Sequence, residues 1–404
     1  MRVLIVKTTS MGDVVHAVPV VEDIKRFISD AEIDWLVEDS FADIPRHVAG
    51  VSEVIECSVR KWKKRIFEKS TRGQIKALCE KLRSKHYDLV IDLQGLIKSA
   101  VLASWTNAPV AGYDWRSGKE PLATVLYSIK SSVDRQKSAV DRCRELAAKS
   151  LGYDFGSTKP QFNFKFEGSP ESVGCVFFFC NTSRETKLWP EEKWIELGAE
   201  LIRRGKKIVL PWGSPEERDR VLRIQARLGT GAEVPDRMSI GQLMEKISSS
   251  DAVIGLDTGM THLSAAMGRP TVGIFRDYPI ELVPLVGEGK KKALGGVGCC
   301  PQVQEVLSAF EKVIQGFFHV RFTAVCFMPR RRRLCSIYTS ARASSRSTWS
   351  IGPSDSERLI IRRALKAEPE FGYMQFLSER PAPRFLWSSR FLNAGRTPKF
   401  FIRT

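Results

Sequence analysis

The first nineteen residues, M-R-V-L-I-V-K-T-T-S-M-G-D-V-V-H-A-V-P (1–19), join an apolar run, a polar turn with glycine and a second apolar segment. This order predicts a strand, a turn and a helix, as in the phosphate-binding loops of Rossmann-like domains. The turn matches neither G-x-G-x-x-G nor G-x-x-x-x-G-K-[ST], and it carries an acid, Asp13. The stretch therefore indicates an α/β fold and leaves the role of Asp13 open.

The same alternation continues along the chain and restarts near residue 174. We expect strands at 3–6, 33–37, 53–57, 87–93, 109–113, 174–180, 207–211, 252–256 and 271–275. Helical spacing marks 13–27, 76–85, 137–151, 189–204, 215–226, 259–267 and 303–314. Apolar strands alternating with helices form parallel sheets covered on both faces. The pattern predicts two doubly wound α/β domains, 1–160 and 161–316, facing each other across a cleft.

The end of the chain differs from the rest in composition. Residues 317–404 hold 15 Arg and 2 Lys against 5 acids, so they carry +12 of the net charge of +17. The remaining +5 gives no argument for nucleic-acid binding by the core. We expect the segment 317–404 to be disordered or poorly packed, and a frameshifted end is one hypothesis for its origin. Binding of polyanions through this tail, in a non-functional variant, remains an alternative.

The composition fits a cytosolic globular protein. Hydrophobic residues make up 43% and charged residues 27% of the chain, without the apolar run of a membrane span or the features of a signal peptide. The nine cysteines include no C-x-x-C pair, so we expect reduced thiols.

The clearest candidate site in the second half is D-T-G-M-T-H (257–262), where a strand ends and a helix begins. Backbone N–H groups at Gly259 could bind a diphosphate, Asp257 a sugar hydroxyl, and His262 a phosphate oxygen. Equally, Asp257 or Thr258 could cap the helix and His262 could be a packed core residue.

Two further loops follow strands of the same predicted sheet. In N-T-S-R-E-T-K (181–187), Thr182 and Ser183 offer hydroxyl groups and Lys187 offers a charge suited to a diphosphate, or it is a solvated lysine. In P-W-G-S-P-E-E (211–217), a carboxylate could accept from a ribose hydroxyl or stabilise a helix start. Taken together, three such loops at one edge of the sheet indicate a nucleotide-binding site.

Basic residues gather in the first half at V-R-K-W-K-K-R (59–65). They form either a solvated face or a clamp for an acidic acceptor, such as one held in a membrane. Asp13 either caps its helix or, if a phosphate donor lies across the cleft, takes a proton from an acceptor hydroxyl. A Rossmann dehydrogenase is disfavoured, because no strand is followed by G-x-G-x-x-G.

Six motifs in order resemble the lipopolysaccharide heptosyltransferase I family over about residues 1–316. They are K-T-T-S-M-G-D-V-V-H (7–16), D-L-Q-G-L-I-K-S-A (92–100), D-W-R-S-G-K-E-P-L-A (114–123), K-L-W-P-E-E-K-W (187–194), L-P-W-G-S-P-E-E (210–217) and D-T-G-M-T-H-L-S-A-A (257–266). The resemblance implies a GT-B fold with the acceptor in the first domain and ADP-heptose in the second. It implies inverting transfer of heptose to Kdo of Kdo2-lipid A without a metal or cofactor, which agrees with the absence of D-x-D from residues 1–316.

The resemblance also implies residue roles, with Asp13 as the general base. ADP-heptose would be held by Thr182, Ser183, Lys187, Glu217, Met238, Asp257, Thr258, Gly259 and His262. Kdo carboxylates and lipid A phosphates would be met by Arg60, Lys63, Lys64 and Lys98. The implied protein is a monomer, peripheral on the cytoplasmic face of the inner membrane, with no nucleic-acid partner for its core. A related heptosyltransferase with another core acceptor is the alternative.

Overall fold

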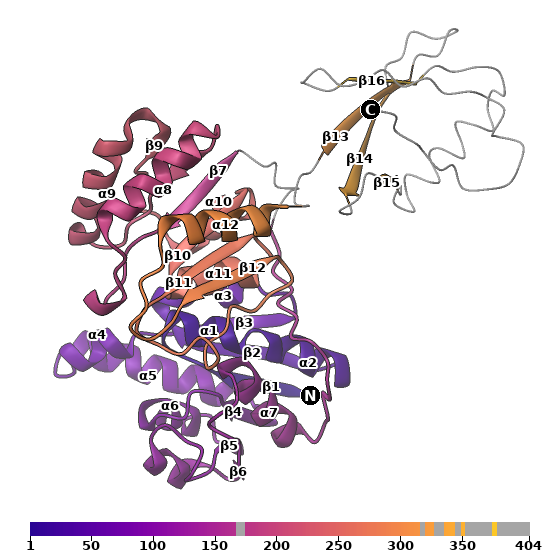
Figure 1. Ribbon diagram of the computed structural model, residues 1–404. Coiled ribbons are helices and arrows are strands. Elements are labelled where there is room, and N and C mark those ends of the chain that lie inside the picture. The colour runs from indigo at the N-terminus through magenta and orange to yellow at the C-terminus, as the bar shows by residue number, and fades with distance from the viewer. Residues whose placement is uncertain (167–173, 316–319, 327–334, 344–348, 352–373, 378–404) are drawn as a thin grey trace, which may run out of the picture. The chain divides into compact units, whose positions relative to one another are not determined.

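The computed structural model (Figure 1) describes residues 1–166 and 174–315, together with four strands of the remaining chain. The chain divides into two compact units, Met1–Val313 and Ile314–Thr404. The first unit contains two six-stranded sheets, and the second contains a four-stranded sheet.

The first sheet is parallel and has the strand order β3-β2-β1-β4-β5-β6. Its strands are β1 (Arg2–Val6), β2 (Glu32–Glu38), β3 (Val51–Cys57), β4 (Leu89–Asp92), β5 (Val110–Tyr113) and β6 (Ile129–Ser131). Strand β1 lies in the middle, with Val3 paired to both Ile33 and Leu89. The polar turn that follows β1 therefore lies at the carboxyl edge of the sheet, where doubly wound folds bind ligands.

Helices cover both faces of this sheet (Figure 1). Buried residues of α1 (Met11–Ala17), α2 (Pro19–Phe27) and α7 (Ala139–Leu151) pack on one face. The other face carries α4 (Val59–Lys64), α5 (Lys69–Ser84), α6 (Ile97–Ser104) and the 3₁₀ helix η2 (Pro121–Leu126). The short helices η1 (Asp39–Phe41) and α3 (Asp43–Arg46) link β2 to β3.

The expected single helix over 13–27 is wrong, because the structure has two helices there. They meet at Val18, and α2 begins with Pro19. Proline has no N–H for a helical hydrogen bond but is well suited to the first turn of a new helix. The Val18 N–H bonds to the Val15 carbonyl at 3.1 Å, which tightens the end of α1. Because of this break, α1, which carries Asp13, is a short helix of its own.

The second sheet repeats the plan with the order β12-β11-β10-β7-β8-β9, again parallel. Its strands are β7 (Cys175–Phe179), β8 (Lys207–Val209), β9 (Ala232–Glu233), β10 (Ala252–Leu256), β11 (Thr271–Phe275) and β12 (Lys291–Gly295). The helices of this half are η3 (Glu185–Lys187), α8 (Glu191–Arg203), α9 (Pro215–Leu228), η4 (Gly229–Gly231), α10 (Ile240–Ser248), α11 (Gly259–Ala266) and α12 (Val303–Ile314). The prediction of two doubly wound parallel sheets is confirmed.

The described part of the second unit is an antiparallel sheet in the order β15-β14-β13-β16. Its strands are β13 (Val320–Cys326), β14 (Cys335–Ala343), β15 (Trp349–Ile351) and β16 (Met374–Leu377). Most of the segment 317–404, for which the sequence predicts disorder or a frameshifted origin, lies outside the described residues. Among the residues that are described, no helix combines the length and apolar character of a membrane span.

Candidate active site

The two halves of the first unit meet where α1 packs on α11 (Figure 1). Helix α1 follows the carboxyl end of β1, and α11 follows the carboxyl end of β10. Leu263 and Ala266 of α11 and Met244 of α10 belong to the same apolar cluster as the core of the first sheet. The carboxyl edges of the two sheets thus face each other, and residues at the starts of α1 and α11 are brought close.

Asp13 lies in the first turn of α1 and is held in a fixed orientation. Its Oδ2 accepts from the Ser10 N–H at 3.0 Å and from the Ser10 hydroxyl at 3.1 Å. Its Oδ1 lies 3.5 Å from Nζ of Lys119. Burial acts to raise the pKa of Asp13, but the charges of Lys7 and Lys119 and the Ser10 N–H outweigh it and lower the pKa to about 2. Asp13 is therefore ionised at neutral pH.

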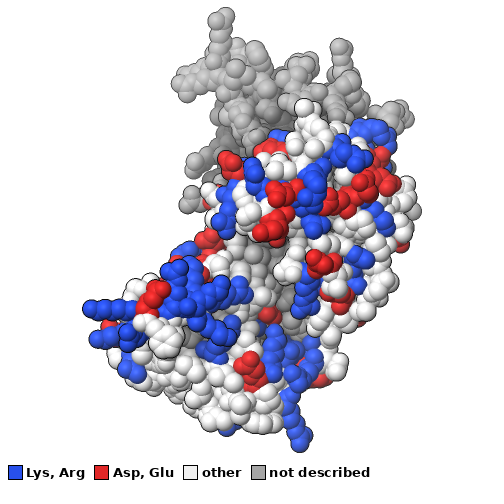
Figure 2. Space-filling view, turned by 90° about the vertical axis from the view of Figure 1, so that its left-hand side faces the viewer, with Lys and Arg blue, Asp and Glu red and all other residues white. Residues whose placement is uncertain are grey.

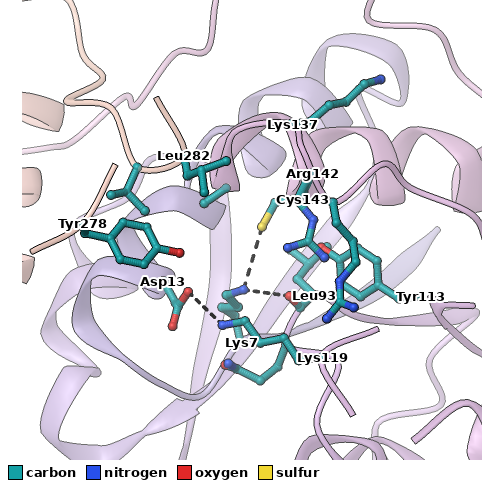
Figure 3. Close-up of a pocket in the computed structure, with 14 residues that line it drawn as sticks. Lys7, Asp13, Leu93, Tyr113, Lys119, Lys137, Arg142, Cys143, Tyr278 and Leu282 are labelled. Carbon is teal, nitrogen blue, oxygen red and sulfur yellow. Dashed lines mark hydrogen bonds and ion pairs between the residues drawn. The ribbon is translucent and has the colours of Figure 1, made fainter. Parts of the chain in front are cut away.

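Asp13 borders a cavity of about 140 Å³ lined by five cationic side chains (Figure 3). These cations are Lys7, Lys119, Arg135, Lys137 and Arg142. Lys7 is buried, and its Nζ donates to the Leu93 carbonyl at 2.7 Å. Tyr278 and Leu282 of the second half close the cavity, and the Leu282 carbonyl accepts from the Ala139 N–H at 3.2 Å. The excess of positive charge beside one carboxylate suits an anionic ligand.

Three predicted donor-site residues come together at the start of α11. Nζ of Lys187 donates to Oδ2 of Asp257 at 2.5 Å, and Nε2 of His262 lies 3.1 Å from Oδ1. Burial of the Asp257 carboxylate acts to raise its pKa, but hydrogen bonds from His262 and Lys187 produce a net lowering. Asp277 Oδ1 is 3.8 Å from the same lysine nitrogen. Lys187 is thus held at the carboxyl edge of the second sheet by carboxylates.

A pair of histidines connects this cluster to α1. Nε2 of His16 lies 3.4 Å from Nδ1 of His262, whose Nε2 faces Asp257. Burial, reinforced by His262, lowers the pKa of His16 to about 3, so its ring is neutral. The network assigns the His262 proton to Nε2, facing the carboxylate, and makes Nδ1 the acceptor of the His16 N–H. Buried polar contacts therefore run from the helix of Asp13 to Lys187.

Gly259 is the first residue of α11, and Thr258 is its N-cap. A Cβ placed on Gly259 would lie 2.5 Å from Cβ of Met11. Only glycine allows α1 to approach this helix start so closely. The backbone N–H groups of the first turn of α11 remain available for an anion.

The other predicted donor residues have local roles in the structure. Oε2 of Glu217 accepts from the N–H groups of Gly213 at 2.7 Å and Ser214 at 3.3 Å, which caps α9. Met238 packs, partly buried, against the apolar cluster of the second sheet. Thr182 Oγ1 accepts a long bond of 3.5 Å from the N–H of Arg184, and Ser183 is exposed. The contacts of Glu217 are those of a residue that stabilises a helix start, which was one of the two interpretations of this loop.

The predicted acceptor residues do not line the cavity. Arg60, Lys63 and Lys64 are exposed on α4, which is anchored by the buried Trp62. Lys98 is partly buried, and its Nζ donates to the Thr9 hydroxyl at 2.9 Å.

None of the five cationic side chains that line the cavity was predicted from the sequence. Lys7 and Lys119 lie inside the motifs that carry the family resemblance, and Arg135, Lys137 and Arg142 surround the start of α7. Membership in those motifs was the available signal for the first two. The other three required the fold.

Two doubly wound domains that meet at the carboxyl edges of their sheets are the arrangement of glycosyltransferases with the GT-B fold. The chain belongs to glycosyltransferase family 9 (heptosyltransferase), whose family model matches residues 75–313.

Several relatives support this assignment. Lipopolysaccharide heptosyltransferase 1 of Escherichia coli strain K12 is 40% identical over 280 residues, which cover 68% of this chain and 88% of the relative. The enzyme of the same name from Salmonella typhimurium strain LT2 is 35% identical over 331 residues, or 79% and 100% of the two chains. The solved structure of E. coli heptosyltransferase WaaC with ADP superposes with a TM-score of 0.71 at 36% identity, covering 77% of this chain and 99% of that one. The GT-B expectation is confirmed.

Proposed function

We propose that this glycosyltransferase moves heptose from ADP-heptose to Kdo of Kdo2-lipid A, a step of lipopolysaccharide inner-core synthesis. The similarity to lipopolysaccharide heptosyltransferases 1 supports the proposal. So does the similarity to a solved structure of the E. coli enzyme with ADP-2-deoxy-2-fluoro heptose, at a TM-score of 0.67 and 37% identity. The observation that carries it is an ionised carboxylate, Asp13, between a basic cavity and a helix start suited to diphosphate.

On the donor side, the diphosphate would lie against the N–H groups that begin at Gly259. Lys187 would exchange its contact with Asp257 for a phosphate oxygen, since both partners are anions and the lysine side chain is flexible. As the bond from the anomeric carbon to the diphosphate breaks, Lys187 and the helix start stabilise the growing negative charge. Thr182, Ser183, Glu217, Met238, Thr258 and His262 complete the proposed donor site.

On the acceptor side, a Kdo carboxylate would lie among Lys7, Lys119 and Arg142. A second anion there neutralises the field that lowers the pKa of Asp13 and so raises this pKa. Acceptor binding would thereby make Asp13 a stronger base at the moment when it is needed.

The transfer is then a single displacement. Asp13 takes the proton of a Kdo hydroxyl, the hydroxyl oxygen bonds to the anomeric carbon of heptose from the face opposite the diphosphate, and ADP leaves with the electron pair. This order inverts the anomeric configuration. Contact between the two halves excludes water from the reacting atoms.

We further propose that the reaction needs no metal, because Lys187 and the start of α11 supply positive charge at the diphosphate. The described residues contain no group of three metal-binding side chains. We propose domains 1–160 for the acceptor and 161–316 for the donor, in a monomer that works peripherally at the cytoplasmic face of the inner membrane. Lipid A phosphates would meet Arg60, Lys63, Lys64 and Lys98.

A transfer assay with ADP-heptose tests the proposal. Mass spectrometry should detect addition of one heptose to Kdo2-lipid A and to an acyl-free Kdo acceptor, with undiminished rate in EDTA. Binding of ADP without transfer to either acceptor would refute the assigned acceptor and favour a related heptosyltransferase with another core acceptor. Loss of transfer in EDTA, restored by a divalent cation, would refute metal independence.

A further inference from the structure

An exposed apolar surface covers the outer side of α6 and η2 in the first domain. It consists of Ile97, Val101, Leu122, Val125 and Leu126, here called the α6–η2 patch. Leu122 is 61% exposed and Val125 is 72% exposed, values far from those of core residues. Single exposed aliphatic residues are ordinary on a protein surface, but a contiguous group marks an interaction site.

The patch is held rigidly by the core beneath it. Ile97 and Val101 are four residues apart on α6 and so share one side of the helix. The intervening Ala100 is buried, as are Ala123 and Tyr127 at η2, and all three belong to the apolar cluster under this face of the sheet. The outward aliphatic side chains are therefore a fixed feature of two packed helices and not a frayed loop.

The patch adjoins the mouth of the basic cavity. Lys119 lines the cavity, and η2 begins two residues later at Pro121. Glu120 Oε2 accepts from the Ile97 N–H at 2.7 Å, which joins the approach to η2 to the start of α6. A molecule that reaches Asp13 past Lys119 therefore passes along this surface.

Positive charge flanks the patch in the same helical layer. Helices α4 and α5 pack on the same apolar cluster as α6 and η2. The exposed basic residues of α4, α5 and the segment between them are Arg60, Lys61, Lys63, Lys64, Arg65, Lys69, Arg72, Lys76, Lys81 and Arg83. Figure 2 shows Lys and Arg side chains gathered on a projecting lobe beside a largely uncharged surface. Phe67, in the segment between α4 and α5, is 90% exposed.

This surface matches the two layers of an anionic bilayer, its acyl boundary and its headgroups. It combines exposed aliphatic residues and an exposed phenylalanine with a surrounding group of lysines and arginines. Apolar side chains enter the boundary between headgroups and acyl chains, and basic ones meet lipid phosphates. The core of a protein–protein interface, in contrast, is depleted of lysine.

We propose that the layer formed by α4, α5, α6 and η2 docks the enzyme on anionic phospholipid bilayers, with the α6–η2 patch inserted. The inference rests on the proposed function in one respect. A lipid acceptor keeps its acyl chains in the bilayer while its sugar reaches Asp13, so the docking surface must adjoin the cavity mouth, as the patch does.

Sedimentation of the full chain with vesicles tests the inference, using phosphatidylglycerol–phosphatidylethanolamine vesicles and pure phosphatidylcholine ones. The test variant is Leu122→Ser with Val125→Ser, and the control is Val297→Ser, a valine in the turn after β12 that is 66% exposed. We expect anionic vesicles to bind the wild-type chain and the control equally, with weaker binding in high salt. The double variant should bind about tenfold less tightly, because two aliphatic side chains no longer leave water.

The two proposals fail in different ways. Equal vesicle binding by the double variant and the wild type, or no binding by the wild type, overturns the docking surface, and the second result favours a protein partner for the patch. The double variant should still transfer heptose to the acyl-free Kdo acceptor at the wild-type rate. Absence of transfer by the wild type to any Kdo acceptor refutes the proposed function, whatever the vesicles show.

Discussion

Replacement of Asp13 by asparagine separates the charge of this side chain from its shape. Asparagine keeps the volume and an oxygen that can accept from the Ser10 N–H, but it cannot take a proton from an acceptor hydroxyl. A positioned general base contributes about 10²- to 10⁴-fold to rate, so we expect kcat to fall by that factor. This loss corresponds to about 3–5 kcal/mol in the barrier.

The same change has a calculable effect on folding. The Asp13 pKa is about 2 in the folded protein against an ordinary value of 3.8, a difference of about 2 kcal/mol in favour of the ionised folded state. Because the folded pKa is the lower one, this stabilisation is fully present above pH 3.8 and is lost as the pH falls toward 2. Asp13→Asn should therefore lower the free energy of unfolding by about 2 kcal/mol at pH 7, and the difference should shrink below pH 3.8.

Three measurements examine this reasoning together: single-turnover heptose transfer, calorimetric ADP binding, and urea unfolding at several pH values. Asp30→Asn, at an exposed carboxylate, is the control. Transfer by Asp13→Asn within tenfold of wild type would refute the general-base role. Loss of ADP binding in parallel with transfer would instead assign Asp13 to the donor site.

Three other substitutions give further expectations. Lys187→Ala should reduce kcat/KM for ADP-heptose by about 10²-fold, because the leaving diphosphate loses its cation; an unchanged value would contradict that role. His16→Ala leaves Nδ1 of the buried His262 without its donor and should lower the free energy of unfolding by about 1–3 kcal/mol in urea titration. Arg144→Met leaves the buried Asp23 carboxylate, 2.6 Å from the guanidinium, without its partner; the expected cost is about 3–5 kcal/mol, and an unshifted urea midpoint would contradict it.

Much of the fold follows from the sequence because buried strands have a simple signature. The apolar runs at β1, β7 and β10 stand out, since both faces of a central parallel strand are covered. The edge strands β6, β9 and β12 were not predicted. The sequences of β6 and β12, I-K-S and K-K-A-L-G, contain the exposed lysines Lys130 and Lys292, and their pairing depends on a neighbour distant in the chain.

The site was predictable only where its residues lie in local motifs. Lys187 and Asp257 were chosen because each follows a strand, and the fold brings them within 2.5 Å. The cavity beside Asp13 was not predictable, because Arg142 and Lys7 line the same cavity only as a result of the packing of α7 on α1. A charge-rich sequence such as 59–65 attracts attention, but charge density alone does not show which lysines face a cavity.

The close approach at Gly259 ties the evolution of the two halves together. This residue opens the helix proposed to hold the diphosphate, and it also touches Met11, two residues before Asp13. A single added methyl group would act as a wedge between the halves, because the three atoms nearest to it all belong to Met11. Gly259→Ala should thus trap a more open shape, visible as a larger radius of gyration in small-angle scattering, and compensation should come from a smaller residue at position 11. An unchanged radius in Gly259→Ala would show that the interface yields at this point.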